Sequence, residues 1–168
     1  MNKTFFSASM ILLLSGIFIS CSKTDIDSND PITENNIDTQ KLLDLVNDVR
    51  STGTTCGTTY YSPVDAIVWN CKLEKAALKH SKDMMDNNFF SHTSSNGDKF
   101  VDRLNDAGYS YNKAGENIAL GYSSEESVIN GWLTSQGHCA NIMNPNFTEM
   151  GVGRIGDYWT QDFGKTKE

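Results

Sequence analysis

The fold is decided by three short stretches: Gly115-Glu116-Asn117-Ile118, Ser135-Gln136-Gly137-His138 and Tyr158-Trp159-Thr160-Gln161. A fourth stretch, Phe90-Ser91-His92, lies upstream of them. Together they contain two of the three histidines of the chain, one carboxylate and a strand-like segment with Tyr and Gln. No helical or strand period relates residues at such separations. A shared polar site in the folded protein is therefore the hypothesis to test.

The N-terminus has the pattern of an export signal. Lys3 precedes an apolar run, residues 10–19, which is shorter than the roughly 20 residues that a membrane-spanning helix needs. Such a run is typical of the apolar region of a signal peptide. We predict a lipoprotein signal peptide over residues 1–20 and an exported mature protein of one domain, because 168 residues suit a single core.

The signal run ends in Phe18-Ile19-Ser20-Cys21, which is similar to a lipobox. We interpret Cys21 as the residue that carries a diacylglyceryl anchor, rather than as a disulfide partner, and expect the protein at the outer membrane or cell surface. The alternative is ordinary secretory cleavage nearby, with Cys21 incidental. Residues 21–38 are polar and acidic and bury too little to order themselves, so we predict a flexible tether there.

The charge of the chain argues against nucleic acid as a partner. Lys3 is the only charged residue in residues 1–20, so their removal takes the formal net charge from −7 to −8. Affinity for nucleic acid depends on Lys and Arg contacts to phosphates, and an acidic domain repels them. We expect no nucleic acid partner.

Apolar spacing and capping residues predict four helices. Their expected positions are residues 39–50, 71–87, 100–107 and 123–137, with caps at Asp38 or Thr39, at Asn70 and at Ser123 with Glu126, and with stops at Gly108 and Gly137. Residues 150–154 and 158–163 predict two strands joined at Gly156-Asp157. Residues 115–121 form a third strand or an irregular edge. Helices beside a small antiparallel sheet indicate an α+β domain.

Two patterns within these elements bear on the site. His80 repeats with Leu73, Ala77 and Met84 on one apolar stripe, so we interpret it as a hydrogen-bonded core histidine rather than a ligand. Alternation along the last strand sends Tyr158, Thr160 and Asp162 to one face of the sheet and Trp159, Gln161 and Phe163 to the other. One of these faces covers the core, and the other lines a cleft.

His92, Glu116 and His138 are the candidate site. Two imidazoles and a carboxylate with an open position suit Zn²⁺, although the spacing matches no known metal motif. For Glu116 the alternative is a buried carboxylate that holds the region of Asn117 through backbone N–H groups. For His138 the alternative is a loop brace just past a helix C-terminus, where protonation is favoured. The chain has no G-x-S-x-G elbow, phosphate-binding loop or dinucleotide fingerprint.

Three cysteines remain after Cys21. Cys56, Cys71 and Cys139 permit one disulfide in an exported protein and leave one thiol. Cys56 with Cys71 closes a short loop, whereas Cys56 with Cys139 ties the start of the domain to the segment that bears His138. The residues alone leave both pairings open.

At these positions the chain resembles the CAP superfamily (cysteine-rich secretory proteins, antigen 5 and pathogenesis-related 1), in its bacterial SCP-like branch. The resemblance covers residues 39 to about 165. It rests on the order of these motifs: His80-Ser81-x-Asp83-Met84, Phe90-Ser91-His92, Asp102-Arg103-Leu104, Ala107-Gly108-Tyr109, Gly115-Glu116-Asn117-Ile118-Ala119, Trp132-x-x-Ser135-x-Gly137-His138-Cys139, Asn141-Ile142-Met143, Phe147-x-Glu149-x-Gly151-Val152-Gly153 and Tyr158 to Gly164. It implies a three-layer α-β-α sandwich with a central cleft.

The resemblance also implies a set of cleft residues. His92 and Glu116 match the first His and first Glu of the four residues that hold a divalent cation in eukaryotic members. Ser135 and Tyr158 stand at the positions of the second Glu and second His, and His138 offers a replacement imidazole. The cleft set is therefore His92, Glu116, Ser135, His138 and Tyr158. Bacterial relatives have cysteines in a pattern that favours pairing Cys56 with Cys139.

Three functions follow from these patterns. Family members are mostly secreted binding proteins, so the first is an envelope-anchored module that binds a small lipid, peptide or glycan in this cleft. The alternative is a hydrolase assisted by Zn²⁺ or another divalent cation, with His92, Glu116 and His138 around the metal and with Glu116 and His138 as its catalytic residues. The third is a structural envelope protein whose cleft residues only brace loops.

Overall fold

The structure is a computed structural model that describes Cys21 and residues 35–167. The expected signal peptide and all of the expected tether except Cys21 and residues 35–38 lie outside the described residues. The elements, in chain order, are α1 (Thr39–Thr52), β1 (Thr54–Cys56), β2 (Thr59–Tyr61), β3 (Val68–Trp69), α2 (Cys71–Asp86), α3 (Phe100–Asp106), β4 (Tyr111–Leu120), α4 (Glu125–Thr134), α5 (Gln136–Ile142), β5 (Glu149–Ile155) and β6 (Tyr158–Thr166).

A four-stranded sheet forms the centre of the domain, with strand order β3-β5-β6-β4. β5 and β6 form the predicted antiparallel hairpin, and β4 pairs with β6 as a full strand rather than an irregular edge. The short strand β3 was not predicted, and it pairs with β5 in parallel. The predicted small antiparallel sheet is thus present in β4, β5 and β6, and β3 adds a parallel pair at its edge.

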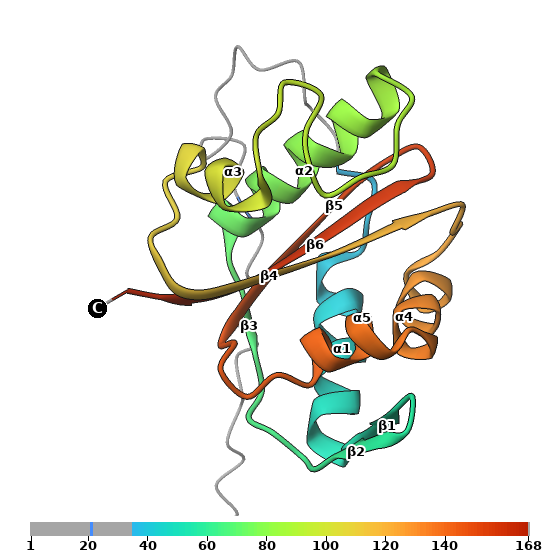
Figure 1. Cartoon of the computed structure of the whole chain (residues 1–168). Helices are drawn as coiled ribbons and strands as arrows, with labels where there is room; N and C mark the ends of the chain where they lie inside the picture. Colours follow the sequence, from blue (N-terminus) through green and yellow to red (C-terminus); the bar gives the residue numbers. More distant parts are fainter. Residues whose placement is uncertain (1–20, 22–34, 168) are drawn as a thin grey trace, which may run out of the picture.

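Helices cover both faces of this sheet (Figure 1). α2 and α3 lie on one face, and α1, α4 and α5 lie on the other, which confirms the three-layer α-β-α arrangement. α2 approaches β5 closely because Gly151 and Gly153 have no side chain there. A Cβ atom would lie 2.1 Å from the backbone nitrogen of Glu74 at Gly151 and 2.2 Å from that of Leu78 at Gly153.

The larger part of the core lies on the side of α1, α4 and α5, where Trp132, Trp159 and Phe163 are almost completely buried. Arg50 of α1 is also buried, and its guanidinium donates to the backbone carbonyls of Asp65, Ile142, Asn144 and Phe147. This arginine ties α1 to the segment that follows α5.

The helix capping confirms some predicted boundaries and corrects others. Asp38 accepts from the backbone of Lys41 and Asn70 from that of Lys72, as predicted. The capping box of α4 consists of Ser124 and Ser127, however, not Ser123 and Glu126. α4 ends at Thr134, because Ser135 is extended (φ −91°, ψ 121°), and a separate helix, α5, begins at Gln136.

The short hairpin β1-β2 is attached to α5 by a disulfide between Cys56 and Cys139. This pairing confirms the one that the family resemblance implied. Both cysteines are completely buried. The disulfide fixes the helix that bears His138 to the hairpin that follows α1.

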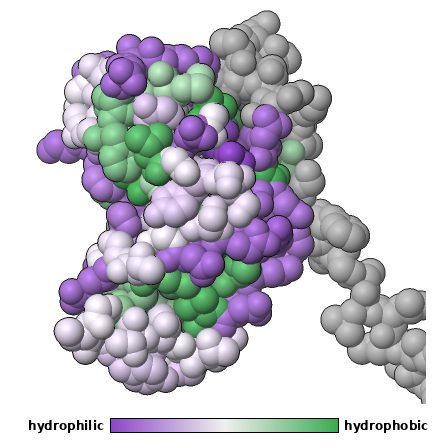
Figure 2. Space-filling model, turned by 90° about the vertical axis from the view of Figure 1, so that its right-hand side faces the viewer, coloured by the Kyte–Doolittle hydropathy of each residue, from purple (hydrophilic) through white to green (hydrophobic). Residues whose placement is uncertain are grey.

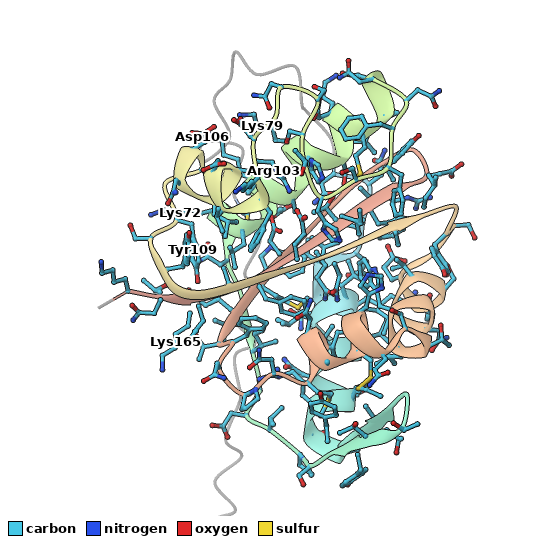
Figure 3. The ribbon with its side chains drawn as sticks, in the orientation of Figure 1. Lys72, Lys79, Arg103, Asp106, Tyr109 and Lys165 are labelled. Atoms are coloured by element: carbon cyan, nitrogen blue, oxygen red, sulfur yellow. A yellow bond between two sulfur atoms is a disulfide. The ribbon has the colours of Figure 1, made fainter. Side chains whose placement is uncertain are left out.

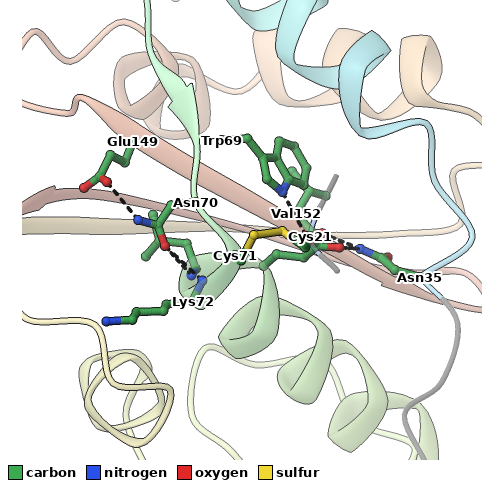
Figure 4. Close-up of a disulfide and its surroundings, with 10 residues drawn as sticks. Cys21, Asn35, Trp69, Asn70, Cys71, Lys72, Glu149 and Val152 are labelled. Atoms are coloured by element: carbon green, nitrogen blue, oxygen red, sulfur yellow. Dashed lines mark hydrogen bonds between the residues drawn. A yellow bond between two sulfur atoms is a disulfide. The ribbon is translucent and has the colours of Figure 1, made fainter. Parts of the chain in front are cut away.

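A second disulfide joins Cys21 to Cys71, the first residue of α2 (Figure 4). This bond contradicts the expectation that Cys21 is not a disulfide partner, and lipid attachment to Cys21 stays a prediction. A thioether to diacylglycerol would use the same sulfur atom, so the two states exclude each other. Cys71 is therefore not left as a thiol. Within the part of the chain that the structure describes, no helix is long and apolar enough to cross a membrane.

Candidate functional site

Glu116 of β4 and His92 of the α2–α3 loop form the centre of the candidate site. The Nδ1 atom of His92 lies 2.7 Å from Oε1 of Glu116. Because a carboxylate only accepts hydrogen bonds, His92 donates through Nδ1–H. The other ring nitrogen, Nε2, is not used in this contact. The Glu116 side chain is only 2% exposed, whereas the His92 side chain is 54% exposed. A buried carboxylate thus holds an imidazole at the surface.

The second oxygen of Glu116 is bound by Arg103 of α3. The guanidinium donates through its NH2 group to Oε2, and both side chains are 2% exposed. The NH1 group of Arg103 donates to the carbonyl of His92 at 3.1 Å and to Oγ of Ser94 at 3.0 Å. Arg103 therefore neutralises Glu116 and also fixes the loop on which His92 lies. The expectation that Glu116 binds backbone N–H groups is wrong, since its side-chain partners are His92 and Arg103.

Asp162 lies directly opposite Glu116 in the register of β4 and β6. It is completely buried, and neither of its side-chain oxygens has a hydrogen-bond partner among the described residues. Burial first, and then the charge of Glu116, raise the pKa of Asp162 well above its ordinary value. Asp162 is therefore a buried acid with a raised pKa, beside the carboxylate that pairs with Arg103.

His138 lies on the opposite side of β4, in the first turn of α5. Side-chain amides hold this helix on the strand: Asn117 donates to the carbonyl of His138 at 3.2 Å, and Asn141 donates to Oδ1 of Asn117 at 2.9 Å. Burial, and then the nearby His92, lower the pKa of His138. The sequence placed His138 past a helix C-terminus, where protonation is favoured. That expectation is wrong, because α5 begins at Gln136.

The other two expected cleft residues occupy different surroundings. Ser135 is the N-cap of α5, and its carbonyl accepts from the backbone of Cys139 at 2.9 Å. Tyr158 pairs with Leu120 at the far end of β6, four residues from the pair of Glu116 and Asp162, which is about 13 Å along a strand. The structure thus brings His92 and Glu116 into contact, brings His138 within electrostatic reach of His92, and separates Tyr158 from them.

His80 is the core histidine that its apolar stripe predicted. It is completely buried, and Nε2 lies 2.9 Å from the carbonyl of Ser91. Burial, and then the charge of Arg103, lower its pKa. A neutral His80 therefore helps to fix the base of the loop that bears His92.

The arrangement does not fit the divalent cation expected for His92, Glu116 and His138. Both oxygens of Glu116 already have partners, and one partner is the cationic Arg103, which would repel a metal ion at the same carboxylate. Within Cys21 and residues 35–167, ligand atoms of three His, Cys, Asp or Glu residues gather within 4.8 Å only at Cys21, Cys71 and Glu74. Those two cysteines form a disulfide.

Comparison with known proteins agrees with this fold. The model of the family "CAP: Cysteine-rich secretory protein family" matches residues 43–163. The chain belongs to the CAP family. All of the candidate site, from His92 to Tyr158, lies within the matched residues.

Two curated relatives come from Bacillus subtilis (strain 168). The uncharacterized protein YkwD is 46% identical over 93 residues, which are 54% of this chain and 36% of YkwD. The uncharacterized membrane protein YlbC is 34% identical over 126 residues, which are 75% of this chain and 34% of YlbC. The chain thus spans about a third of the length of these relatives.

Solved structures confirm the CAP fold. An extracellular protein containing a SCP domain from Bacillus anthracis str. Ames has a TM-score of 0.68 and 36% identity, over 76% of this chain and 40% of that one. An outer surface protein from Borrelia burgdorferi has a TM-score of 0.66 at 22% identity, over 76% of this chain and 92% of its own. The second likeness concerns the fold alone.

Arg103 and Asp162 are the two site residues that sequence reasoning did not select. Arg103 lies next to Leu104 on the buried side of a short helix, where a charged residue signals a buried partner. Strand alternation places Asp162 on the same face as Thr160, but its position opposite Glu116 depends on the register of β4. Arg103 could thus have been selected from the sequence, as a charged residue on the buried side of a helix. The position of Asp162 opposite Glu116 could be seen only in the structure.

Proposed function

We propose that this CAP domain is an exported binding module that recognises a peptide or glycan through His92 and His138. The observation that carries the proposal is the contrast between His92, which is more than half exposed, and its fully buried partners Glu116 and Arg103. Burying two charged groups to fix an imidazole costs desolvation free energy. An exposed loop does not need such a pair in order to fold. Such preorganisation lowers the entropy lost on binding.

The groups at the site favour a polar ligand over a lipid. The described contacts around Glu116 and Asn117 involve the imidazole of His92, side-chain amides, a guanidinium and the backbone carbonyl of His138. The large exposed apolar side chains Tyr60, Val68, Met85, Phe90 and Leu120 come from separate parts of the chain. On the face drawn in Figure 2, hydrophilic residues separate the apolar patches. A peptide or glycan would use the hydrogen-bonding groups that the site offers.

Export is supported by the apolar run at residues 10–19 and by the extracellular Bacillus anthracis relative. The buried disulfide between Cys56 and Cys139 suits an oxidising compartment. The disulfide-bonded form leaves no sulfur on Cys21 for a lipid. Intact mass spectrometry of protein from native membranes and medium separates the two forms, because a diacylglyceryl group adds mass that reduction does not remove.

The metal-assisted hydrolase that the sequence also suggested has no support in this geometry. Arg103 supplies the positive charge beside Glu116, and no described contact places a hydroxyl or thiol nucleophile against His92. A purely structural role would explain why Glu116 and Arg103 are buried and paired. It does not account for the exposed ring of His92.

The test compares binding by the wild type with that of His92→Gln and His138→Gln on arrays of peptides and envelope glycans. Each change keeps a hydrogen-bonding side chain but removes the imidazole. We expect affinity for the same array members to fall about tenfold, the effect of losing one hydrogen bond at the site. Tyr158→Phe is the matched control, because Tyr158 lies at the other end of β6, and it should leave binding unchanged. Equal binding by all four proteins would contradict the proposal.

A further inference from the structure

A cavity that shares no residue with the candidate site lies at the end of the sheet where β6 ends. Its volume is about 560 Å³, and it lies between the first turn of α2, the segment 107–110 and the end of β6. Its polar lining comes from Asn70, Lys72, Lys75, Tyr109, Ser110 and Thr166. Figure 3 shows Lys72 and Tyr109 at the end of the molecule where β6 ends. A cavity of this size suits a small organic molecule.

The two lysines of this cavity are not neutralised by a neighbour. Two other lysines of α2 form ion pairs, Lys79 with Asp106 of α3 and Lys82 with Asp86. Among the residues that the structure describes, no ion pair includes Lys72 or Lys75. The lining itself contains no acidic residue. Two unpaired ammonium groups at one cavity attract an anion, although the protein as a whole carries a net charge of −7.

The nearest carboxylate, Glu149, already has partners that occupy its oxygens. Asn70 donates to Oε1 at 2.8 Å, and Tyr109 and Thr166 donate to Oε2. Burial alone would raise the pKa of Glu149, but the hydrogen bonds from Thr166, Tyr109 and Asn70 outweigh burial and hold the pKa below its ordinary value. Glu149 thus organises the cavity wall, and its oxygens do not contact Lys72 or Lys75 within the distance of an ion pair.

Two further lysines lie at the same end of the sheet. Lys113 of β4 and Lys165 of β6 are directly paired across the strands, and both are exposed. Like charges at directly opposite positions destabilise a sheet. Side chains alternate along a strand, however, so Lys165 lies on the face of the sheet opposite to Thr166, and neither lysine belongs to the cavity lining. The N-terminal N–H groups of α2 add little, since Asn70 already accepts from Lys72 and Leu73.

We propose that this cavity binds an oxyanion group, a carboxylate or a phosphate, carried on a molecule of about the size of a sugar. Lys72 and Lys75 form the charged contacts, and the hydroxyl of Ser110 is an additional donor. The rest of the ligand lies against Ala107, Gly108 and the Cys71 side of the wall. This site is independent of the proposed function of His92 and His138.

The test is an NMR titration of ¹⁵N-labelled protein with glucuronate, glucose 6-phosphate, inorganic phosphate and glucose. We expect saturable shifts of the Gly108 and Ser110 amides with at least one of the two charged sugars and none with glucose. Comparing glucuronate with glucose 6-phosphate identifies the preferred anion, and inorganic phosphate reports how much the sugar contributes. No saturable shift with either charged sugar would overturn the proposal.

A matched pair of double variants separates a site from general charge. Lys72→Gln with Lys75→Gln should weaken binding by about tenfold or more, because charge-assisted hydrogen bonds are lost. Lys79→Gln with Lys82→Gln changes the net charge equally on the same helix but outside the cavity lining. It should alter affinity by less than about twofold, as expected for exposed charges. Equal weakening by both double variants would also overturn the proposal.

Discussion

Two buried arginines in this protein have different tasks. Arg50 is 1% exposed and donates only to backbone carbonyls, which join α1 to the segment after α5. Arg103 is 2% exposed and pairs with the carboxylate of Glu116, which in turn holds the exposed ring of His92. One arginine braces the fold, whereas the other fixes the electrostatics of a surface group. The comparison shows that a buried charged residue does not by itself identify a functional site. The group that it binds, backbone carbonyls or the carboxylate of a site residue, distinguishes the two cases.

The largest expected effect comes from removing each arginine. Arg103→Met should lower the free energy of unfolding by about 3 to 5 kcal/mol at pH 7, because it leaves Glu116 buried without its cationic partner. Arg50→Met should also lower it by about 3 kcal/mol or more, since carbonyls that accept from Arg50 lose a charged donor, at about 1.5 to 3 kcal/mol per bond. Urea denaturation measures both.

The pH dependence should separate these two variants. Without Arg103, the buried carboxylate of Glu116 lacks its cationic partner, which disfavours the charged form in the folded state. The stability deficit of Arg103→Met relative to the wild type should therefore be smallest in acid, where carboxylates are protonated, and grow toward neutral pH. The deficit of Arg50→Met should be independent of pH, because carbonyls do not titrate. Parallel pH profiles for the two variants would remove the distinction between the arginines.

The next largest effect concerns Asp162. Its folded pKa is raised above the ordinary value of 3.8, so the folded state retains a proton that the unfolded state loses. The contribution of this group to stability is therefore complete below pH 3.8 and decreases as pH rises.

Asp162→Asn cannot ionise, so it avoids the free-energy cost of keeping a proton that the unfolded state loses. It should be more stable than the wild type at pH 7 by on the order of 1 kcal/mol or more, since each unit of pKa difference corresponds to about 1.4 kcal/mol. The advantage should shrink toward about pH 4, where the unfolded state also holds the proton. Asp157→Asn, in the exposed turn between β5 and β6, is the control and should show no such trend. Thermal unfolding of the three proteins across this pH range provides the measurement.

Much of the fold was predictable because its signals are local. The caps Asp38 and Asn70 and the stop at Gly108 (φ +75°) act within one turn of the chain. The prediction of a stop at Gly137 is wrong, because this glycine lies inside α5 without a positive φ and with open space where a Cβ atom would stand. The end of α4 is set instead by the extended backbone of Ser135, which no residue pattern marks.

The site was predictable only in part because its geometry depends on pairing between distant segments. His92 and Glu116 are adjacent because the α2–α3 loop folds over β4, and Arg103 fixes that loop. Tyr158 was expected in the cleft from its motif position, but the register of β4 and β6 places it beside Leu120. The lipobox-like segment predicted an anchor at Cys21, whereas the structure pairs this residue with Cys71.

The smallest expected effect tests how closely His92 and His138 approach each other. Burial is the larger cause of the lowered pKa of His138, and the charge of His92 is the second. His92→Gln removes only the second cause, so the pKa of His138 should rise while staying below the ordinary value of 6.5. NMR titration of the ring carbon signal of His138 provides the measurement. An unchanged pKa would place the two imidazoles in separate surroundings.

The central claim is that Arg103 and Glu116, rather than a metal ion, hold the ring of His92. The most direct measurement is a long-range ¹H–¹⁵N NMR spectrum of the histidine rings at about pH 7.5, where an ordinary histidine is mostly neutral, before and after addition of one equivalent of Zn²⁺. The account predicts that His92 carries its proton on Nδ1, and that neither His92 nor His138 shifts when zinc is added. A spectrum with Nδ1 of His92 unprotonated, or joint zinc-dependent shifts of His92 and His138, would contradict it.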